Sequence, residues 1–195
     1  MPDKAKQALL NKARLDKFVL SLTVPEALKS TVSKVERAVR NHSTSRAMPD
    51  MLQFSIYGVV VPSVTVLSNA LPYTGQELKV TSHARSSYED VTVNFTIDNQ
   101  FNNYWYIWRW LDVLNDHKLG VYDDRNEILP RRLLEDYQTN FTVFGLNEYN
   151  KNTIEFTYTK AFPISLGEMM FNYRTTDEVE CSLTFSFSQL HVNLL

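Results

Sequence analysis

The segment VECSLTFSF at residues 179–187 places an apolar side chain at every second position, with Glu, Ser or Thr between them. A period of two is that of a β-strand, because successive side chains of a strand point to opposite faces of its sheet. The segment therefore predicts a strand with one buried face and one polar face.

The same alternation recurs along the chain and makes β-structure the main expectation. It predicts strands at residues 18–24, 91–97 and 154–159. The apolar stretch 51–61 predicts another strand, with a bulge or change of sheet near Gly58. Residues 64–66 follow Pro62, and PYTG at 72–75 is typical of a turn that leads into a strand.

One helix is expected to interrupt the strands, at residues 100–116 (QFNNYWYIWRWLDVLND), with Asp98 or Asn99 as its cap. Its apolar stripe is wide, which predicts a helix buried on more than one side. The predicted fold class is mainly β, in the broad α+β sense: an antiparallel β-sandwich or barrel with one main helix flanking it.

Length and composition limit the possibilities further. A chain of 195 residues suits a single domain, residues 1–195. Its single cysteine, Cys181, excludes an intramolecular disulfide and every multi-cysteine metal site, and the alternation places this thiol on the apolar face of its strand. No apolar run approaches the roughly 20 residues that span a bilayer, and the N-terminus is too charged for a secretory signal. We therefore expect a soluble protein made in the cytosol, without a membrane partner.

Charge is unevenly distributed along the chain. Residues 1–50 contain 10 Lys/Arg and 5 Asp/Glu, whereas residues 51–195 contain 10 and 17, so a +5 segment and a −7 segment make up the formal charge of −2. The near-neutral total argues against a dedicated duplex-DNA binder. Residues 29–50 are interpreted as an inserted basic arm or loop. A solvated surface is the ordinary fate of such a charge run, and binding of nucleic acid is the minority alternative.

No catalytic, metal or cofactor motif is found in the sequence. The four histidines are scattered, and none lies near another histidine or the cysteine at metal-ligand spacing. Glycine-rich phosphate loops and nucleophile elbows are lacking as well. Acidic pairs such as Glu89-Asp90 could in principle serve acid–base catalysis, but such pairs are common in turns. We predict a protein that is not an enzyme and has no cofactor.

The aromatic run YWYIWRW at 104–110 has two interpretations. Trp105, Trp108 and Trp110 could stack on single-stranded nucleic acid, with Arg109 on the phosphates. Alternatively, the run packs a helix against a barrel or a neighbouring subunit. The helical spacing favours packing, because stacking platforms lie on exposed strands or loops.

Three stretches from about Met51 onward, taken in order, resemble a known family. They are VVVPSVTV followed by PYTGQELKV; YEDVTV at 88–93 with Asp98, Phe101, Trp108 and Trp110; and AFPISLG at 161–167, then 169–173, then 177–179 opening the closing strand. In this order they resemble the tail tube proteins of contractile-tailed bacteriophages of the T4-like kind, relatives of the ring proteins of type VI secretion and other contractile injection systems. Relatives usually have Trp where this chain has Val91, and a shorter turn where it has residues 82–87. In the family the third stretch is a Phe-Pro-x-x-x-Gly turn, a short strand, an acidic turn and a closing strand, so the resemblance implies a turn at 161–167 and a short strand at 169–173.

The resemblance implies hexameric rings whose inner wall is a continuous β-barrel, stacked into the tube through which the genome is ejected. Implied partners are the tail sheath, the baseplate and tail terminator proteins, and DNA or a tape measure protein passing through the lumen without sequence-specific binding. The implied location is the virion tail, assembled in the host cytoplasm. The motif positions expected to be structural or at interfaces are Pro72, Gly75, Tyr88, Asp90, Trp108, Trp110, Phe162, Pro163 and Gly167.

Two further sets of residues are candidates within that picture. The polar strand positions Thr92, Asn94, Thr96, Glu180, Ser182 and Thr184 are candidates for the lumen face. Lys34, Arg37 and Arg40 are candidates for contact between rings or with the sheath, because a positive arm that meets an acidic neighbour provides both attraction and register.

Alternatives remain open. A baseplate or tail-terminator ring would share the fold without polymerising into a tube. A nucleic-acid-binding barrel comes next, and an enzyme comes last.

Overall fold

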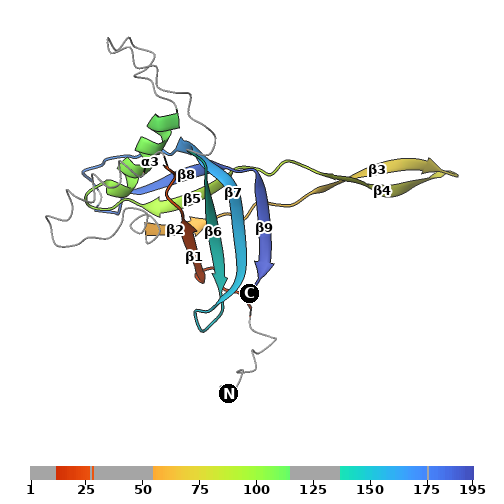
Figure 1. The fold of residues 1–195 in the computed structure, drawn as a ribbon, viewed down its shortest axis with the longest axis horizontal. Helices are drawn as coiled ribbons and strands as arrows, with labels where there is room; N and C mark the ends of the chain where they lie inside the picture. Colours follow the sequence, from red (N-terminus) through yellow and green to blue (C-terminus); the bar gives the residue numbers. More distant parts are fainter. Residues whose placement is uncertain (1–11, 27, 29–54, 115–136, 175) are drawn as a thin grey trace, which may run out of the picture.

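The computed structural model describes residues 12–26, 28, 55–114, 137–174 and 176–195. Within them the chain is mainly β, and every pairing of strands is antiparallel. In chain order the elements are β1 (Phe18–Leu22), β2 (Ile56–Val59), β3 (Val66–Tyr73), β4 (Gln76–Arg85), β5 (Val91–Thr96), the helix α3 (Asn102–Leu114), β6 (Thr139–Leu146), β7 (Asn152–Leu166), β8 (Glu180–Ser186) and β9 (Gln189–Leu194) (Figure 1). The predicted class, antiparallel β-structure with one main helix, is confirmed for the described residues.

The body of the molecule is a seven-stranded sheet folded into two layers that share β7. The first half of β7 pairs with β6 and β9, and its second half pairs with β8, so the strand order is β1-β6-β7-β8-β5-β2 with β9 also on β7. In Figure 1, β1, β6, β7 and β9 run across β2, β5 and β8, which lie behind them. The core lies between the layers.

The transition between the layers occurs at Lys160. Its φ is 54°, a left-handed conformation that bends the strand, and the register of β6 against β7 shifts at the same place. The Lys160 N–H donates to Asn140 Oδ1 at 3.1 Å, which satisfies a donor that the bulge removes from the ladder. A single strand can therefore belong to two sheets.

Aromatic rings in contact run through the core from the helix to the far end of β8. The series is Tyr106–Trp110–Phe185–Phe141–Tyr158–Phe187–Tyr88, with centroid separations between 4.2 and 6.3 Å. Phe185 is the third ring of the series and contacts Trp110 of α3 at 5.8 Å and Phe141 of β6 at 5.1 Å. This one side chain joins both layers and the helix.

The helix α3 is fixed at its start and buried on one face. Asp98 Oδ1 accepts a hydrogen bond of 2.7 Å from the Asn102 N–H, so the prediction of Asp98 as the cap is confirmed. Asn103 is fully buried, and its amide donates to Thr96 O at 2.8 Å. The buried face also holds Tyr106, Ile107 and Trp110.

The opposite face of α3 is open. Trp105 and Trp108 are 37% and 46% exposed, so the described chain buries only one side of the helix, and burial of a second side, against a neighbouring subunit, stays a prediction. The wide apolar stripe contains one core face and one surface face. Sequence periodicity cannot separate these two, because both consist of aromatic side chains.

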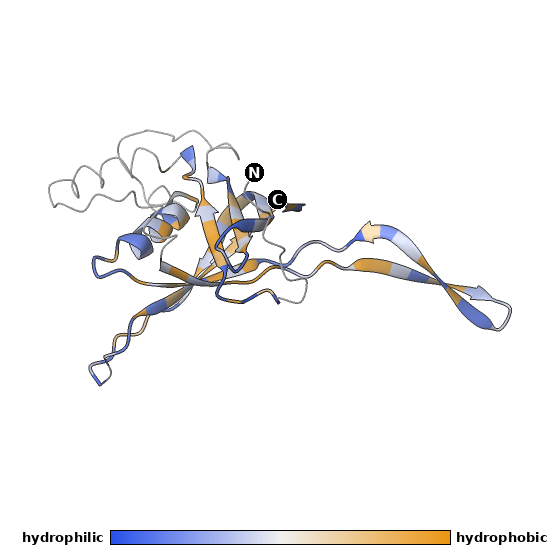
Figure 2. Cartoon of the chain, turned by 90° about the horizontal axis from the view of Figure 1, so that it is seen from below, coloured by the Kyte–Doolittle hydropathy of each residue, from blue (hydrophilic) through white to orange (hydrophobic). Residues whose placement is uncertain are grey.

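The strands β3 and β4 form a two-stranded hairpin that projects far from the body (Figure 1). We call it the arm, residues 66–85. Its tip is a two-residue turn, Thr74-Gly75, with φ of 37° and 81°, which confirms the turn predicted at 72–75. Every residue of β3 is exposed. Figure 2 shows apolar and polar segments interspersed along the arm.

Several strand predictions are confirmed and others need correction. The strands at 18–24, 91–97, 154–159 and 179–187 are present, and the register of β2 shifts between Ile56 and Gly58 as expected. Residues 161–167 were expected to form a turn, but Phe162 and Pro163 continue β7 and pair with β8. Residues 169–173 were expected to form a short strand, but they are a loop. The expected closing strand is β8, but a further strand, β9, follows it. Residues 82–85 extend β4 rather than forming a turn.

Truncating Phe185, the ring that joins both layers and the helix, should destabilise the body strongly. Phe185→Ala leaves a cavity between the layers and is expected to lower the free energy of unfolding by about 3–5 kcal/mol, and Phe185→Leu by less. Denaturant unfolding followed by circular dichroism measures this. Tyr73→Ala at the exposed arm is the matched control and should change stability by less than about 0.5 kcal/mol. Equal losses in both variants would contradict the central role of Phe185.

A buried hydroxyl provides a second test. Tyr158 is fully buried, and its hydroxyl has no hydrogen-bond partner within the described part of the chain. Tyr158→Phe keeps the ring that stacks on Phe141 at 4.2 Å and removes the unpartnered group. It should raise the free energy of unfolding by about 1 kcal/mol.

The same variant should change the alkaline limit of stability. Burial raises the pKa of Tyr158 from 10.0 to about 12, because the phenolate loses its hydration. The unfolded chain therefore releases this proton first, so the stability linked to the neutral form is complete below pH 10 and is lost as the pH rises to 12. Urea titrations at pH 9 and pH 11.5 should show a smaller loss for Tyr158→Phe than for the native chain. An equal loss would mean that Tyr158 does not contribute.

Candidate functional site

The six candidates for a lumen face lie together on one side of the pair β5–β8. Thr92 pairs with Thr184, Asn94 with Ser182, and Thr96 with Glu180. The alternate residues of both strands are buried, which leaves these six on the opposite face. We call them the polar lane. Whether the polar lane lines a lumen stays a prediction.

Neighbouring strands border the polar lane closely. A Cβ on Gly58 of β2 would lie 3.3 Å from Asn94 Nδ2, so glycine allows β2 to pass close to the lane. At the end of the lane, the Tyr57 hydroxyl donates to Glu180 Oε2 at 2.9 Å, and this hydrogen bond raises the pKa of Tyr57. Glu180 is the one charged side chain among the six. The lane is therefore polar, with a single negative charge.

The nine positions of the family motifs do not form one site. Pro72 lies within β3 opposite Glu77, and Gly75 forms the tip of the arm. Tyr88 lies between the arm and β5, with its ring 5.4 Å from Phe187, and Asp90 is exposed directly before β5. These four residues lie along the arm and its base.

The other five positions belong to the body. Trp110 is fully buried and donates from its indole Nε1 to Tyr137 O at 3.0 Å, whereas Trp108 is 46% exposed. Phe162 contacts the Tyr137 ring edge-on at 5.7 Å, and Pro163 follows it in β7. A Cβ on Gly167 would lie 3.1 Å from the backbone N and O of Ser182, so glycine is needed there for the close approach.

Three exposed aromatic side chains lie along one side of α3: Phe101 directly before its first residue, and Trp105 and Trp108 four and seven positions further on. Phe101, Trp105 and Trp108 are 38%, 37% and 46% exposed, and we call them the aromatic strip. Phe171, in the loop between β7 and β8, extends the strip, because its ring lies 6.1 Å from that of Phe101. Sequence reasoning named Trp105 and Trp108 but placed them in a buried helix.

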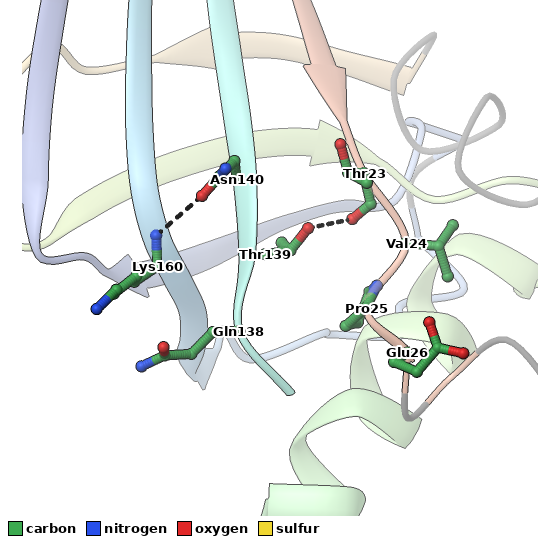
Figure 3. A pocket seen from close by; sticks show the side chains of 8 residues that line it. All are labelled: Thr23, Val24, Pro25, Glu26, Gln138, Thr139, Asn140 and Lys160. Carbon is green, nitrogen blue, oxygen red and sulfur yellow. Dashed lines mark hydrogen bonds between the residues drawn. The ribbon is translucent and has the colours of Figure 1, made fainter. Parts of the chain in front are cut away.

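One open pocket, of about 370 Å³, lies where β1 ends and β6 begins (Figure 3). Thr139 Oγ1 donates to Thr23 O at 2.6 Å across it, which holds the two strands together. The charged residues of its wall are Glu26 and Lys160; the remainder are Thr23, Val24, Pro25, Gln138, Thr139 and Asn140. The wall contains no histidine or cysteine, so it lacks the pairing of a nucleophile with a histidine that covalent catalysis often uses.

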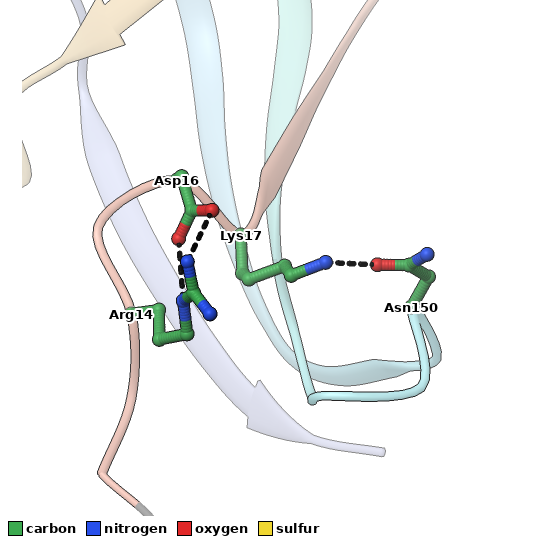
Figure 4. A network of polar contacts seen from close by, with 4 residues as sticks. All are labelled: Arg14, Asp16, Lys17 and Asn150. Carbon is green, nitrogen blue, oxygen red and sulfur yellow. Dashed lines mark hydrogen bonds and ion pairs between the residues drawn. The ribbon is translucent and has the colours of Figure 1, made fainter.

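A small polar network fixes the entry into β1 (Figure 4). Arg14 donates to both carboxylate oxygens of Asp16 at 3.0 Å, and this hydrogen bonding is the main cause of the lowered pKa of Asp16. Lys17 Nζ donates to Asn150 Oδ1 at 2.6 Å, in the turn between β6 and β7. These groups are exposed, so the network contributes little energy and mainly sets geometry.

Other expectations have mixed outcomes. Cys181 is buried on the apolar face of β8 as predicted, and burial raises the pKa of its thiol. Lys34, Arg37 and Arg40 lie outside the described residues. Across the described ranges, no group of His, Cys, Asp and Glu could hold a metal ion. No helix in those ranges is long and apolar enough to cross a membrane.

Sequence reasoning missed the reach of the arm and the strands β6 and β9. Alternation was visible for β6 in TNFTVFGL at 139–146 and would have predicted it. The arm does alternate, with Leu71 and Tyr73 on β3 and Leu78 and Val80 on β4, but this pattern indicates strands and not that they project from the body.

Solved structures of similar fold come from contractile assemblies. The chain matches, over 100% of both chains, one from the cap that terminates the tube of the anti-feeding prophage, with a TM-score of 0.59 and 12% identity. A chain from the sheath–tube complex of the extracellular contractile injection system PVC also matches over 100% of both, with a TM-score of 0.53 and 11% identity. A third, from the PVC sheath/tube terminator, has a TM-score of 0.54 and 12% identity over 95% of this chain and 99% of that one. At these identities the likeness concerns the fold.

A search of curated proteins finds no match. The family of phage tail tube proteins, by contrast, matches residues 13–193, which is nearly the whole chain and includes the arm, the polar lane and the aromatic strip. Tail tube proteins are structural components of the tail. The chain belongs to the phage tail tube protein family.

Proposed function

We propose that this chain builds the inner tube of a contractile tail, as hexameric rings that stack into a conduit for DNA on its way into the host. The observation that carries the proposal is the arm. It is a two-stranded hairpin whose strand β3 is exposed at every residue, and such hairpins are marginally stable in water without a partner. A neighbouring subunit supplies that partner in an assembly.

Open sheet edges support the same conclusion. The strands β1, β2 and β9 each pair on one side only among the described strands. Unpaired edges favour association with other chains, and closing several subunits into a ring pairs or covers them. In the proposed ring the inner wall is one continuous β-barrel.

The polar lane suits the inner wall of such a ring. Thr, Ser and Asn side chains hold water, and Glu180 adds negative charge that repels phosphates. The six side chains of the lane include no aromatic or basic group, so they offer DNA, or a tape measure protein, little to bind. We propose that the polar lane faces the lumen and that the protein is neither an enzyme nor a holder of cofactors.

The remaining partners follow from the same assembly. The tube would contact the surrounding sheath on its outside and the baseplate and terminator proteins at its ends, in a tail assembled in the host cytoplasm. A second candidate function is a terminating ring or baseplate ring. The similarity to the anti-feeding prophage cap, with a TM-score of 0.59, supports that alternative.

Electron microscopy of the purified full-length chain tests the proposal. Hollow tubes of uniform width are expected at high protein concentration. Discrete rings that never stack would favour the terminating or baseplate ring. A chain that stays monomeric under all conditions would contradict both.

Removing the arm should abolish assembly but leave the body folded. The Ser86 N–H donates to Thr65 O at 3.2 Å, so the two ends of the arm are adjacent and an Asn-Gly turn can replace residues 66–85. We expect a monomer by light scattering with a thermal unfolding midpoint close to that of the native chain. Ala70→Ser, which alters only the surface of the arm, is the control and should still assemble. Tubes of normal width from the chain without an arm would contradict the role of the arm.

Charge reversal tests the basic segment 29–50, which we propose as a contact between rings or with the sheath. Replacing Lys34, Arg37 and Arg40 by Glu turns attraction toward an acidic neighbour into repulsion. Rings should still form, but stacking or sheath binding should fall at low salt, as seen by sedimentation. Exchanging the same residues for Arg or Lys keeps the charge and is the matched control. Unchanged assembly of the Glu variant would reject this contact.

A further inference from the structure

The two faces of the arm differ in character. The register pairs Leu71 with Leu78 and Tyr73 with Gln76 on one face, and Ala70 with Lys79 and Pro72 with Glu77 on the other. Leu71, Tyr73 and Leu78 are 48%, 65% and 51% exposed. The arm therefore has an apolar face that nothing in the described chain covers, and a polar face that suits water.

The aromatic strip of α3 is a second uncovered apolar surface on the same chain. Its three side chains and Phe171 together expose large ring areas, as Phe171 itself is 70% exposed. Contiguous exposed apolar patches of this kind mark interaction surfaces. The strip spans about 10 Å at 1.5 Å per residue. The apolar face of the arm, from Val80 opposite Asn69 to Tyr73, spans about 14 Å at 3.4 Å per residue. The two surfaces are comparable in length.

One chain cannot join its own two surfaces. The arm leaves the body on the side away from α3, as the two perpendicular views show (Figures 1 and 2). Contact between the arm of one copy and the strip of another uses two different patches, which is a heterologous contact. Repetition of such a contact produces a closed ring or an open filament, the two forms that a stacked tube needs.

The charges around the strip permit burial under an apolar partner. Arg109 and Asp112, beside the strip on α3, form an ion pair with each other, so covering the strip leaves neither charge unpaired. On the arm, Lys79 and Glu77 project from the opposite face and keep their hydration. Docking through the apolar face therefore avoids the free-energy cost of burying an unpaired charge.

We propose that the arm of one copy docks with its apolar face on the aromatic strip of a neighbouring copy. The proposal rests on the proposed function, because it requires assembly of the chain with itself. It assigns an occupant to a surface that a sheath protein could otherwise cover.

Disulfide trapping tests the contact. In a Cys181→Ala background, Leu78→Cys on the apolar face is combined with Trp105→Cys on the strip, and the assembled protein is oxidised. A contact from arm to strip should produce a ladder of covalent oligomers longer than dimers on a non-reducing gel. Lys79→Cys with Trp105→Cys is the matched control, because its arm cysteine lies one residue away on the polar face and should give no ladder.

Tryptophan emission provides a second measurement in the native chain. Trp105 and Trp108 are partly exposed and Trp110 is already buried, so assembly should shift the emission to shorter wavelength. Leu71→Asp with Leu78→Asp should abolish both the shift and the assembly. This readout remains valid if the cysteine variants fold poorly.

The outcomes separate the two proposals. If rings or tubes form, three results would overturn the docking and leave the proposed function standing. They are the lack of a ladder with Leu78→Cys, equal ladders with both arm cysteines, and the lack of a shift in emission. Native protein that forms neither rings nor tubes would overturn the proposed function and the docking together.

Discussion

The contacts of Phe185 with Trp110 and Phe141 hold the structure together, because they are where the two sheet layers and the helix meet. The layers share β7, but hydrogen bonds along a strand do not prevent its two halves from opening like a hinge. Packing of rings between the layers does. Each aromatic side chain buries roughly 150–250 Å², and edge-to-face or offset pairs gain energy beyond that area. With one cysteine, and no metal cluster in the described ranges, the body depends on this packing.

The same strands that build the core also build the surface of interest. Alternation along β5 and β8 directs Val, Phe, Leu and Cys side chains inward and Thr, Asn, Ser and Glu side chains outward. A shift of register by one residue would exchange these faces, so the buried rings fix the position of the polar lane as well. Function and stability are linked here through strand register.

Much of the fold could be predicted from local pattern, as the segment around Cys181 and the strand after Asp90 illustrate. The six residues of the polar lane were predicted individually, and antiparallel pairing brought them together. The structure corrected three kinds of inference. Pro163 lies in a strand because a bend at Lys160 carries β7 into the second layer, and no local signal shows this bend. Trp108 and Trp110 look equivalent in sequence but lie on opposite sides of the helix. The arm has alternating apolar residues but no core beneath it, so its sequence does not show that it projects from the body.

The strand β7 has a mechanical consequence. Its backbone is continuous through both layers, so tension applied to one layer reaches the other along covalent bonds, in parallel with the side-chain contacts. Side-chain packing resists shear over short distances and then yields, whereas a backbone does not lengthen appreciably. In the proposed tube under load, each subunit would therefore deform at the contacts between copies before its two layers separated. The shared strand β7 and the aromatic packing between the layers together make the subunit the stiff unit and leave compliance to the interfaces.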